Sequence, residues 1–201
     1  RHREANLDRG TGAPEGLSVT LRTDDLASSL ILGGSLGLLE KSNSAPIVPA
    51  EVSNLSNIDV QMWKVSQDEV AKLVANGDGA ESKALGRAAD FSENEKLKYA
   101  RNVAKVHPLK LEKVLGAGVQ TGVVLVNVNS NELEYKPRDG FEPLVQVSDL
   151  AAHIKVGRKS SLVWVTRLSN GQPVGDANIS VYDSEGTKTW SGKTNAEGFA
   201  D

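Results

Sequence analysis

The sequence predicts a mainly β protein with one helical insert. Three observations support this expectation. Short aliphatic and β-branched runs alternate with polar residues along most of the chain. Nineteen glycines and seven prolines supply the turns that many short strands need. Residues 66–106 interrupt the alternation and carry helix-start signals.

The length and composition of the chain limit the functions that it can have. The chain has 201 residues, enough for one large domain or two small ones, and 39% of them are hydrophobic, so it can bury a core. The formal net charge is -3 and the cations are spread along the chain, which argues against a nucleic-acid partner. The absence of cysteine excludes disulfides, thiolate metal sites, a cysteine nucleophile and any cysteine thioester within these residues.

Residues 1–16 precede the first predicted strand. Residues 1–16 are polar and aperiodic, which predicts a flexible segment. The chain begins with Arg1 and contains no apolar segment as long as a signal h-region or a membrane span, so we expect a processed chain or an excised piece. Residues 17–44 predict strands of the first domain or of a preceding one, including two short strands around a glycine turn within residues 26–39.

Residues 45–147 predict one domain with a helical insert at residues 66–106. Pro49 interrupts an extended segment and suits an edge strand. Ser66 and Glu69 have capping-box spacing, which predicts a helix start.

Three further segments of this domain are predicted. Ser92 and Glu95 repeat the capping-box spacing and predict a second helix over residues 97–103. Residues 119–128 are apolar on both faces, which is typical of a central strand, and residues 144–147 predict the strand that follows.

Residues 148–201 predict the start of another β domain, truncated at the end of the chain. Residues 162–166 and 179–182 are β-branched runs around an Asn-Gly and proline connection, which predicts neighbouring antiparallel strands. A short strand is expected at residues 188–190, and Gly198 supplies backbone freedom at a bend.

No catalytic, cofactor-binding or metal-ligating residue is predicted. The three histidines are His2, His107 and His153, and no pair of them has metal-ligand spacing or stands beside a nucleophile motif. Glycine pairs at residues 33–34 and 116–118 lack phosphate-loop spacing. The acidic clusters at residues 24–25 and 183–185 lack the spacing of a calcium loop, so solvated turns are expected.

Two groups of side chains are candidates for contacts with partners. A basic helical face is expected to be solvated, with a partner surface as the alternative; it comprises Lys96, Lys98, Arg101 and Lys105. Trp63, Trp164 and Trp190 each fall in a predicted strand, so they are expected to be core or interdomain anchors. An exposed tryptophan among them would be the first candidate contact for a neighbour.

The order of motifs resembles the bacterial α2-macroglobulins. Residues 168–174 (LSNGQPV) lead to a strand that ends in Tyr-Asp, and a GKTNAEGFA string closes the chain. Upstream, the strand at residues 57–65, the helical excursion, the strand at residues 119–128 and the VQVSDL junction at residues 145–150 occur in the family's order. The resemblance covers residues 45–201 and implies immunoglobulin- or fibronectin-like antiparallel β-sandwich macroglobulin domains.

By this resemblance, the chain would supply structural domains of a non-enzymatic, broad-spectrum protease trap of the bacterial cell envelope. The full-length protein is expected to be periplasmic and lipid-anchored. Its expected partners are target proteases, neighbouring macroglobulin domains and other cell-envelope proteins. The alternatives are an immunoglobulin-like or carboxypeptidase-regulatory-like module of a surface adhesin, and an accessory β-sandwich of a secreted hydrolase.

Overall fold

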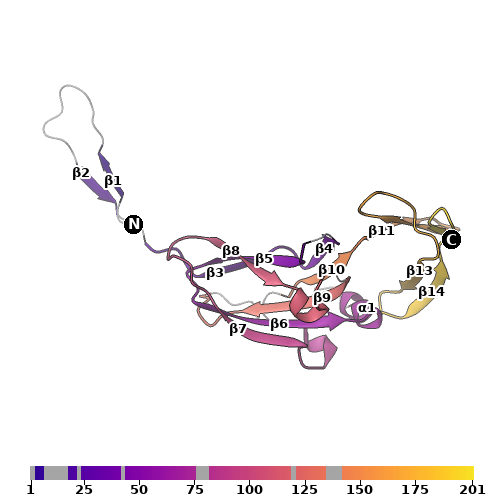
Figure 1. Ribbon diagram of the computed structural model, residues 1–201, viewed down its shortest axis with the longest axis horizontal. Helices are drawn as coiled ribbons and strands as arrows, with labels where there is room; N and C mark the ends of the chain where they lie inside the picture. The colour runs from indigo at the N-terminus through magenta and orange to yellow at the C-terminus, as the bar shows by residue number, and fades with distance from the viewer. Residues whose placement is uncertain are drawn as a thin grey trace, which may run out of the picture.

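The computed structural model describes residues 3–6, 18–21, 24–41, 44–75, 82–118, 121–134 and 142–201. They form a mainly β protein with several antiparallel sheets and few helices, as the sequence predicts (Figure 1). Part of the expected flexible lead-in, residues 1–16, forms β1 (Arg3–Asn6), which pairs antiparallel with β2 (Ser18–Leu21), the first strand after the lead-in. The other residues of the lead-in lie outside the described residues.

A two-sheet sandwich forms the first domain. The larger sheet has the order β4-β10-β9-β6-β7 and the smaller has the order β3-β5-β8. The larger comprises β4 (Leu36–Glu40), β10 (Leu144–Ser148), β9 (Gly122–Asn129), β6 (Asn57–Val65) and β7 (Phe91–Lys96). The smaller comprises β3 (Ser29–Leu32), β5 (Ile47–Ser53) and β8 (Lys105–Lys110).

The two short strands predicted within residues 26–39 are present as β3 and β4, and they belong to different sheets. β4 runs parallel to β10, whereas the other pairings within the two sheets are antiparallel. The chain between residues 29 and 40 therefore contributes one strand to each layer of the first sandwich.

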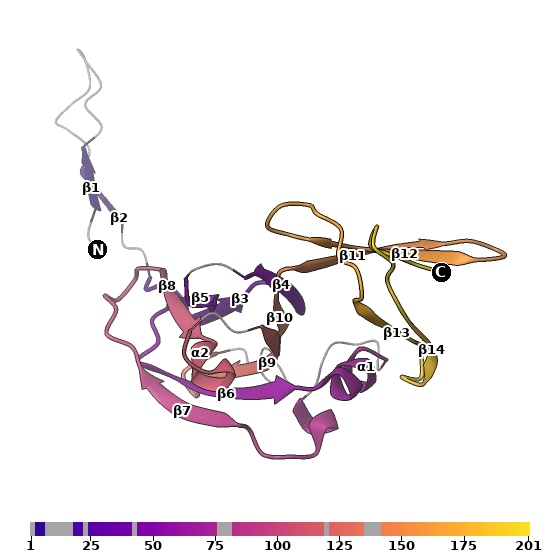
Figure 2. The ribbon, with the colours of Figure 1, turned by 45° about the vertical axis from the view of Figure 1, so that its right-hand side comes forward.

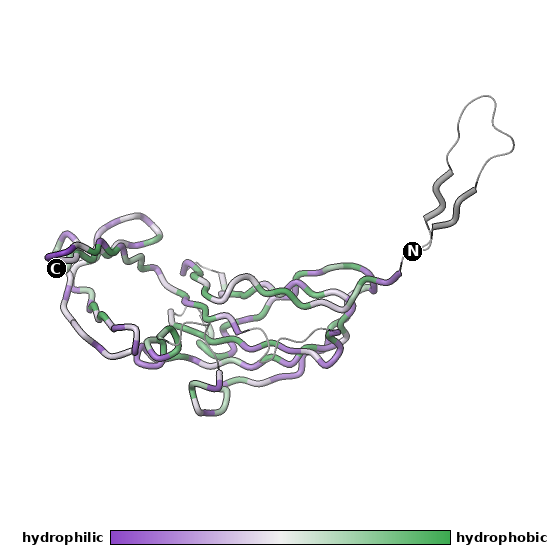
Figure 3. Tube along the Cα trace, turned by 180° about the vertical axis from the view of Figure 1, so that it is seen from behind, coloured by the Kyte–Doolittle hydropathy of each residue, from purple (hydrophilic) through white to green (hydrophobic). Residues whose placement is uncertain are grey.

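The prediction of a central strand is confirmed by β9, which lies between β10 and β6. Val124, Val126 and Val128 are fully buried in the cluster between the two sheets, and Leu125 is fully buried on the opposite face. Both faces of this strand are covered because the second sheet packs on one face and a helix packs on the other. In Figure 3 the hydrophobic residues follow the strands of this sandwich.

The predicted helix start at Ser66 is also confirmed. α1 (Gln67–Ala75) begins there, and the short helical turns η1 (Ser82–Leu85) and α2 (Glu112–Leu115) follow later in the chain. The Ser66 backbone N–H and hydroxyl each donate to Glu69 Oε2 at 2.8 Å, which is the reciprocal half of a capping box. α1 covers the outer face of the larger sheet through Leu73, which is 1% exposed.

The second predicted helix, at residues 97–103 with its start at Ser92 and Glu95, is wrong. Residues 91–96 form β7, which pairs with β6 over six residues. Strand pairing along β6 and burial of Leu97 at the end of β7 prevail over the local capping signal, because tertiary contacts override weak helix propensity. Among the described residues of the insert at 66–106, only α1 and η1 are therefore helical.

Pro49 lies in a central strand rather than at an edge, because β5 pairs with both β3 and β8. Its partner on β8 is Pro108, so neither residue of this pair has an N–H to exchange. The pairing of β5 with β3 covers residues 50–53 and stops one residue short of Pro49. The missing N–H of Pro49 consequently interrupts no ladder hydrogen bond on either side.

The second domain has two layers (Figure 2). One is the sheet β11-β12-β15, made of β11 (Leu150–Val156), β12 (Ser161–Arg167) and β15 (Phe199–Ala200); the other is the hairpin of β13 (Asn178–Tyr182) and β14 (Lys188–Lys193). The predicted pairing of residues 162–166 with 179–182 is wrong, since they lie in different layers. After β12 the chain turns back, and Val174 N–H donates to the Val165 carbonyl at 3.0 Å, which occupies the edge that the later strand would need.

Candidate interdomain joint

The two domains meet first at residues 148–150, where β10 ends and β11 begins. The Ser148 carbonyl accepts from the backbone N–H of Lys41 at 2.8 Å, and the Ser148 hydroxyl accepts from the N–H of Leu150 at 2.9 Å. Ser148 is 7% exposed. One residue, Asp149, separates the last strand of the first sandwich from the first strand of the second domain, so the connection itself has little freedom.

Asp149 ties this connection to the second domain. Its carboxylate accepts from Arg167 Nη1 at 3.1 Å and from the backbone N–H of Ser169 at 3.0 Å, while its carbonyl accepts from the N–H of Leu168 at 2.7 Å. The Ser169 hydrogen bonds and the nearby Arg167 guanidinium hold the pKa of Asp149 below its usual value. The carboxylate therefore stays ionised at neutral pH and fixes the turn that follows β12.

A second contact lies between α1 and the β13–β14 hairpin, which stand side by side in Figures 1 and 2. The Tyr182 hydroxyl donates to Asp68 Oδ1 at 3.3 Å. At the hairpin turn, a Cβ on Gly186 would lie 3.4 Å from the Ala71 carbonyl oxygen and 3.5 Å from Lys72 Cα. Gly186 also has a φ of 76°, a left-handed backbone that favours glycine, and the turn lies in van der Waals contact with α1.

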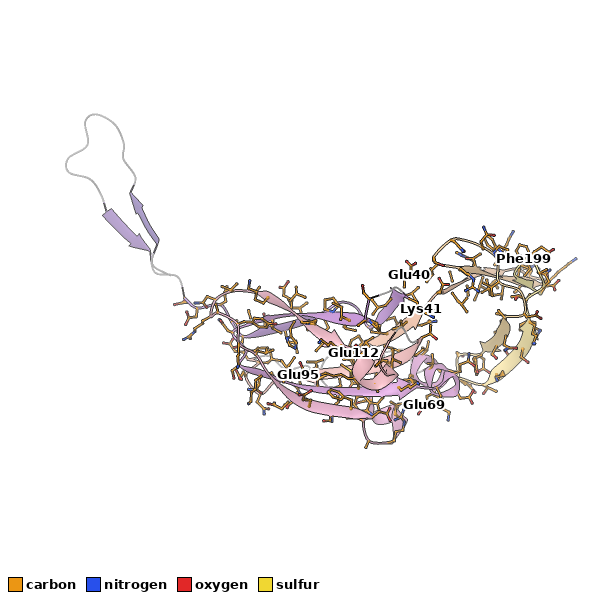
Figure 4. All side chains as sticks on the ribbon, in the orientation of Figure 1. Glu40, Lys41, Glu69, Glu95, Glu112 and Phe199 are labelled. Carbon is orange, nitrogen blue, oxygen red and sulfur yellow. The ribbon has the colours of Figure 1, made fainter. Side chains whose placement is uncertain are left out.

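α1 is packed against and hydrogen-bonded to the first domain, so it provides a fixed surface for this hairpin. Leu73 packs in a cluster with Trp63 and Leu125. Glu69 accepts from Arg87 Nε at 3.0 Å in addition to its capping bonds, and Figure 4 labels it on α1. The hydrogen bonds from Ser66 and Arg87 lower the pKa of Glu69 to about 2.

The joint therefore has two points of attachment, one at Asp149 and one at Gly186. Two separated contacts restrain rotation of the second domain better than a single connection would. The residues at both points make hydrogen bonds and packing contacts. Such contacts can couple the movements of the two domains. Among the described residues, no group of three or more His, Cys, Asp or Glu side chains could hold a metal ion.

The described histidines lie apart. His107 is in β8, and its Nε2 lies 2.7 Å from Glu95 Oε2 on β7, while its Nδ1 lies 3.0 Å from the Tyr99 hydroxyl. Lys113 Nζ donates to Glu95 Oε1 at 2.9 Å. Burial opposes ionisation of Glu95, but the hydrogen bonds from Lys113 and His107 lower its pKa. This cluster closes one side of the first sandwich, where the edge strands of its two sheets meet.

The residues of the other predicted sites do not form a shared site. The basic face at Lys96, Lys98, Arg101 and Lys105 does not exist as a helix face, because these residues belong to β7, a connection, a turn and β8. Arg101 instead pairs with Asp25 at 2.6 Å, which accounts for one residue of the cluster at 24–25. The other predicted acidic cluster, at residues 183–185, is a hydrogen-bonded turn.

The glycine pairs and His153 also have structural explanations. Gly34, Gly116 and Gly118 have positive φ values, as turns require. His153 lies in β11 beside Trp164, and His2 lies outside the described residues.

The tryptophans divide into two kinds. Trp63 is 4% exposed and belongs to the core, as predicted, whereas Trp164 and Trp190 are each 37% exposed. The contact between α1 and the β13–β14 hairpin was not predicted, because Tyr182, Asp68 and Gly186 resemble ordinary turn and helix-surface residues in the sequence. A glycine after Asp183-Ser184-Glu185 indicates a turn, but nothing local indicates that a helix from another domain packs against it.

No helix within the described ranges is both long and apolar enough to cross a membrane. Residues 147–201 match a family model described as the bacterial alpha-2-macroglobulin MG3 domain. No curated protein sequence matches the chain.

Solved structures show the same fold. A structure of Escherichia coli α2-macroglobulin spanning domains MG0-NIE-MG1 matches with a TM-score of 0.69 and 20% identity, over 92% of this chain and 60% of that one. A second, spanning NIE-MG1, matches with a TM-score of 0.69 and 18% identity, over 89% of this chain and 88% of that one. A Salmonella α2-macroglobulin mutant matches with a TM-score of 0.60 and 19% identity, over 94% of this chain and 11% of that one.

These findings confirm the resemblance to the bacterial α2-macroglobulins and the macroglobulin-like β fold. The chain spans less than two thirds of the first of these structures and about a tenth of the Salmonella protein. It therefore matches only a small part of the Salmonella protein.

Proposed function

We propose that this chain, which carries domains of a bacterial α2-macroglobulin with an MG3 domain at residues 147–201, forms part of the framework of a broad-spectrum protease inhibitor. The match to this family model is the observation that carries the proposal. In the proposed mechanism, a protease cleaves a bait segment elsewhere in the full-length protein. The domains then move as rigid bodies and enclose the protease.

The joint supports a framework role. A framework transmits motion only if its domains keep their relative orientation under load. Two attachment points, at Asp149 and at Gly186, provide this restraint. The buried core of the first sandwich resists deformation, since close-packed interiors have low compressibility.

We extend the proposal to the setting of the full-length protein. It is placed in the periplasm as a lipid-anchored protein in cell-envelope defence, with target proteases as transient partners. Neighbouring macroglobulin domains are proposed as its permanent partners, and other cell-envelope proteins are proposed as further partners. These assignments rest on the family and are tested together with the inhibitor role.

The test uses the full-length protein and a panel of proteases with different specificities. Cleavage is followed by gel electrophoresis, and compaction is followed by native gels and small-angle X-ray scattering. One early cut, a decrease in the radius of gyration and a retained protease are expected. A catalytically inactivated protease is the control, and it should cause no compaction.

Scattered cleavage without a change of shape would refute the trap mechanism. It would favour the adhesin-type scaffold instead. Fractionation of the cell envelope with and without the lipid-attachment signal of the full-length protein tests the location separately, and recovery in the cytoplasmic fraction would refute it.

A further inference from the structure

Three aromatic rings stand in one row across the sheet β11-β12-β15. His153 pairs with Trp164, and Trp164 pairs with Phe199. The ring centroids of these two pairs lie 5.5 Å and 5.8 Å apart. Trp164 and Phe199 are each 37% exposed, and Figure 4 labels Phe199 on this layer. The alternate residues of the sheet are buried: Val163, Val165 and Ala200.

Because successive side chains of a strand point to opposite faces, the row lies on the outer face of the second domain. The buried alternate residues mark the inner face. We call His153, Trp164 and Phe199 the aromatic row.

The same face continues into a hollow at the tip of the β11–β12 hairpin. Lys155 and Leu162 are the next cross-strand pair on the same face as His153 and Trp164, and both line the hollow. The hollow has a volume of about 750 Å³ and is lined by this pair and the loop residues 157–161. Gly157 shapes the loop, because a Cβ there would lie 2.5 Å from the Ser160 carbonyl oxygen.

The hollow is cationic. Residues 150–175 contain no Asp or Glu, although the whole chain has a net charge of -3. Lys155, Arg158 and Lys159 make no ion pair with any described residue. Along this sheet, Asp149 precedes β11, and Glu197 and Asp201 stand before and after β15.

β11 also has a free edge. In the part of the chain that the structure describes, it pairs only with β12. Its seven residues include no proline, and all are at least partly exposed. Such an edge presents unpaired backbone N–H and C=O groups that can accept another strand.

We propose that the β11 edge and the adjoining cationic hollow dock an extended acidic polypeptide segment. The segment adds to the free edge of β11 as a further strand. Since alternate side chains of an added strand point to one face, its carboxylates lie beside Lys155 and the loop cations, and an apolar side chain lies against His153 at the end of the aromatic row. Backbone hydrogen bonds supply affinity, and charge complementarity selects acidic segments. This inference does not depend on the inhibitor mechanism.

The probe is a short fluorescent peptide, blocked at both ends, in which one set of alternate positions carries a valine followed by glutamates and the intervening positions carry threonine. It is titrated against the 201-residue chain and followed by fluorescence anisotropy. In an added strand only alternate backbone N–H groups face the edge. N-methylation of one alternate set should therefore abolish binding, and N-methylation of the other set should leave binding intact. Equal effects of the two modified peptides would overturn the proposal.

Charge reversal tests the cationic hollow. The double variant R158E/K159E should weaken binding about tenfold, because it replaces two attractions by two repulsions. Lys193→Glu, an exposed reversal on β14 in the other layer, is the matched control and should change affinity less than twofold. Equal losses in the two variants would overturn the proposal.

Two other anionic partners are tested in parallel. A sulfated polysaccharide and vesicles containing an anionic lipid are titrated under the same conditions. Binding of either one without binding of the acidic peptide would overturn the proposal and assign the hollow to that partner.

Discussion

Truncation of Leu73 provides the sharpest test of how α1 is held. Leu73 is 1% exposed and is the one buried residue of α1. Leu73→Ala removes roughly three methylene equivalents at about 0.8 kcal/mol each, which is about 2.4 kcal/mol of transfer free energy. The cavity left behind adds to this, so the free energy of unfolding should fall by about 3 kcal/mol.

Val74→Ala is the matched control on the same helix. Val74 is 52% exposed, and alanine has the higher helix propensity, so the expected change is below about 0.5 kcal/mol. Urea unfolding is followed by circular dichroism and by the fluorescence of Trp63, with Trp164 and Trp190 replaced by phenylalanine. With a urea m value of about 3 kcal/mol/M, the midpoint of Leu73→Ala should fall by about 1 M.

Equal midpoints for Leu73→Ala and Val74→Ala would refute the packing of α1 on the larger sheet. α1 would then no longer provide a fixed surface for the β13–β14 hairpin. Coincident transitions by the two probes are required before the midpoints are converted into free energies.

Three further predictions concern the joint and its surroundings. The pKa of Glu69 is lowered to about 2 from 4.5, so its stabilisation is complete above about pH 4.5 and is lost as the pH falls towards 2. Glu69→Gln should therefore lower stability at pH 7, and urea unfolding at several pH values should show the difference from the parent vanishing near pH 2; a constant difference would contradict this. Gly186→Val should separate the β13–β14 hairpin from Ala71, seen as a longer distance between spin labels on α1 and β14, because its γ-methyl groups extend beyond a Cβ that is already in van der Waals contact with the helix backbone. Gly171→Val has a similar positive φ with open space around it, so it should cost similar backbone strain of about 1–2 kcal/mol without that separation, and equal distances in both variants would refute the contact. Asp149→Asn should increase amide hydrogen exchange in the turn after β12, because the charged partner of the turn is lost, and unchanged exchange would contradict this assignment.

Local signals in the sequence were reliable where the structure satisfies them locally. The helix start at Ser66 depends on groups three residues apart, and Glu69 makes the expected bonds. The central position of β9 follows from apolar residues on both faces, which only a doubly covered strand can bury. The positive φ of Gly198 likewise belongs to a turn closed by its immediate neighbours.

Signals failed where a distant segment competed with them. The capping-box spacing at Ser92 and Glu95 equals that at Ser66 and Glu69, but the edge of β6 offers residues 91–96 a complete strand ladder. The pairing of β12 with β13 failed for a related reason, since the chain after Arg167 folds back and occupies that edge first.

The β class, the first helix, the central strand and the resemblance of residues 148–201 to a macroglobulin domain could all be predicted from the sequence. Each of these depends on residue patterns within a few neighbouring positions or on a motif order along the chain. Three features became visible only in the folded chain: which strand edges pair, where α1 meets Gly186, and the row formed by His153, Trp164 and Phe199. These features join residues far apart in the sequence, and their free energies come from packing and pairing between segments, which no local pattern encodes.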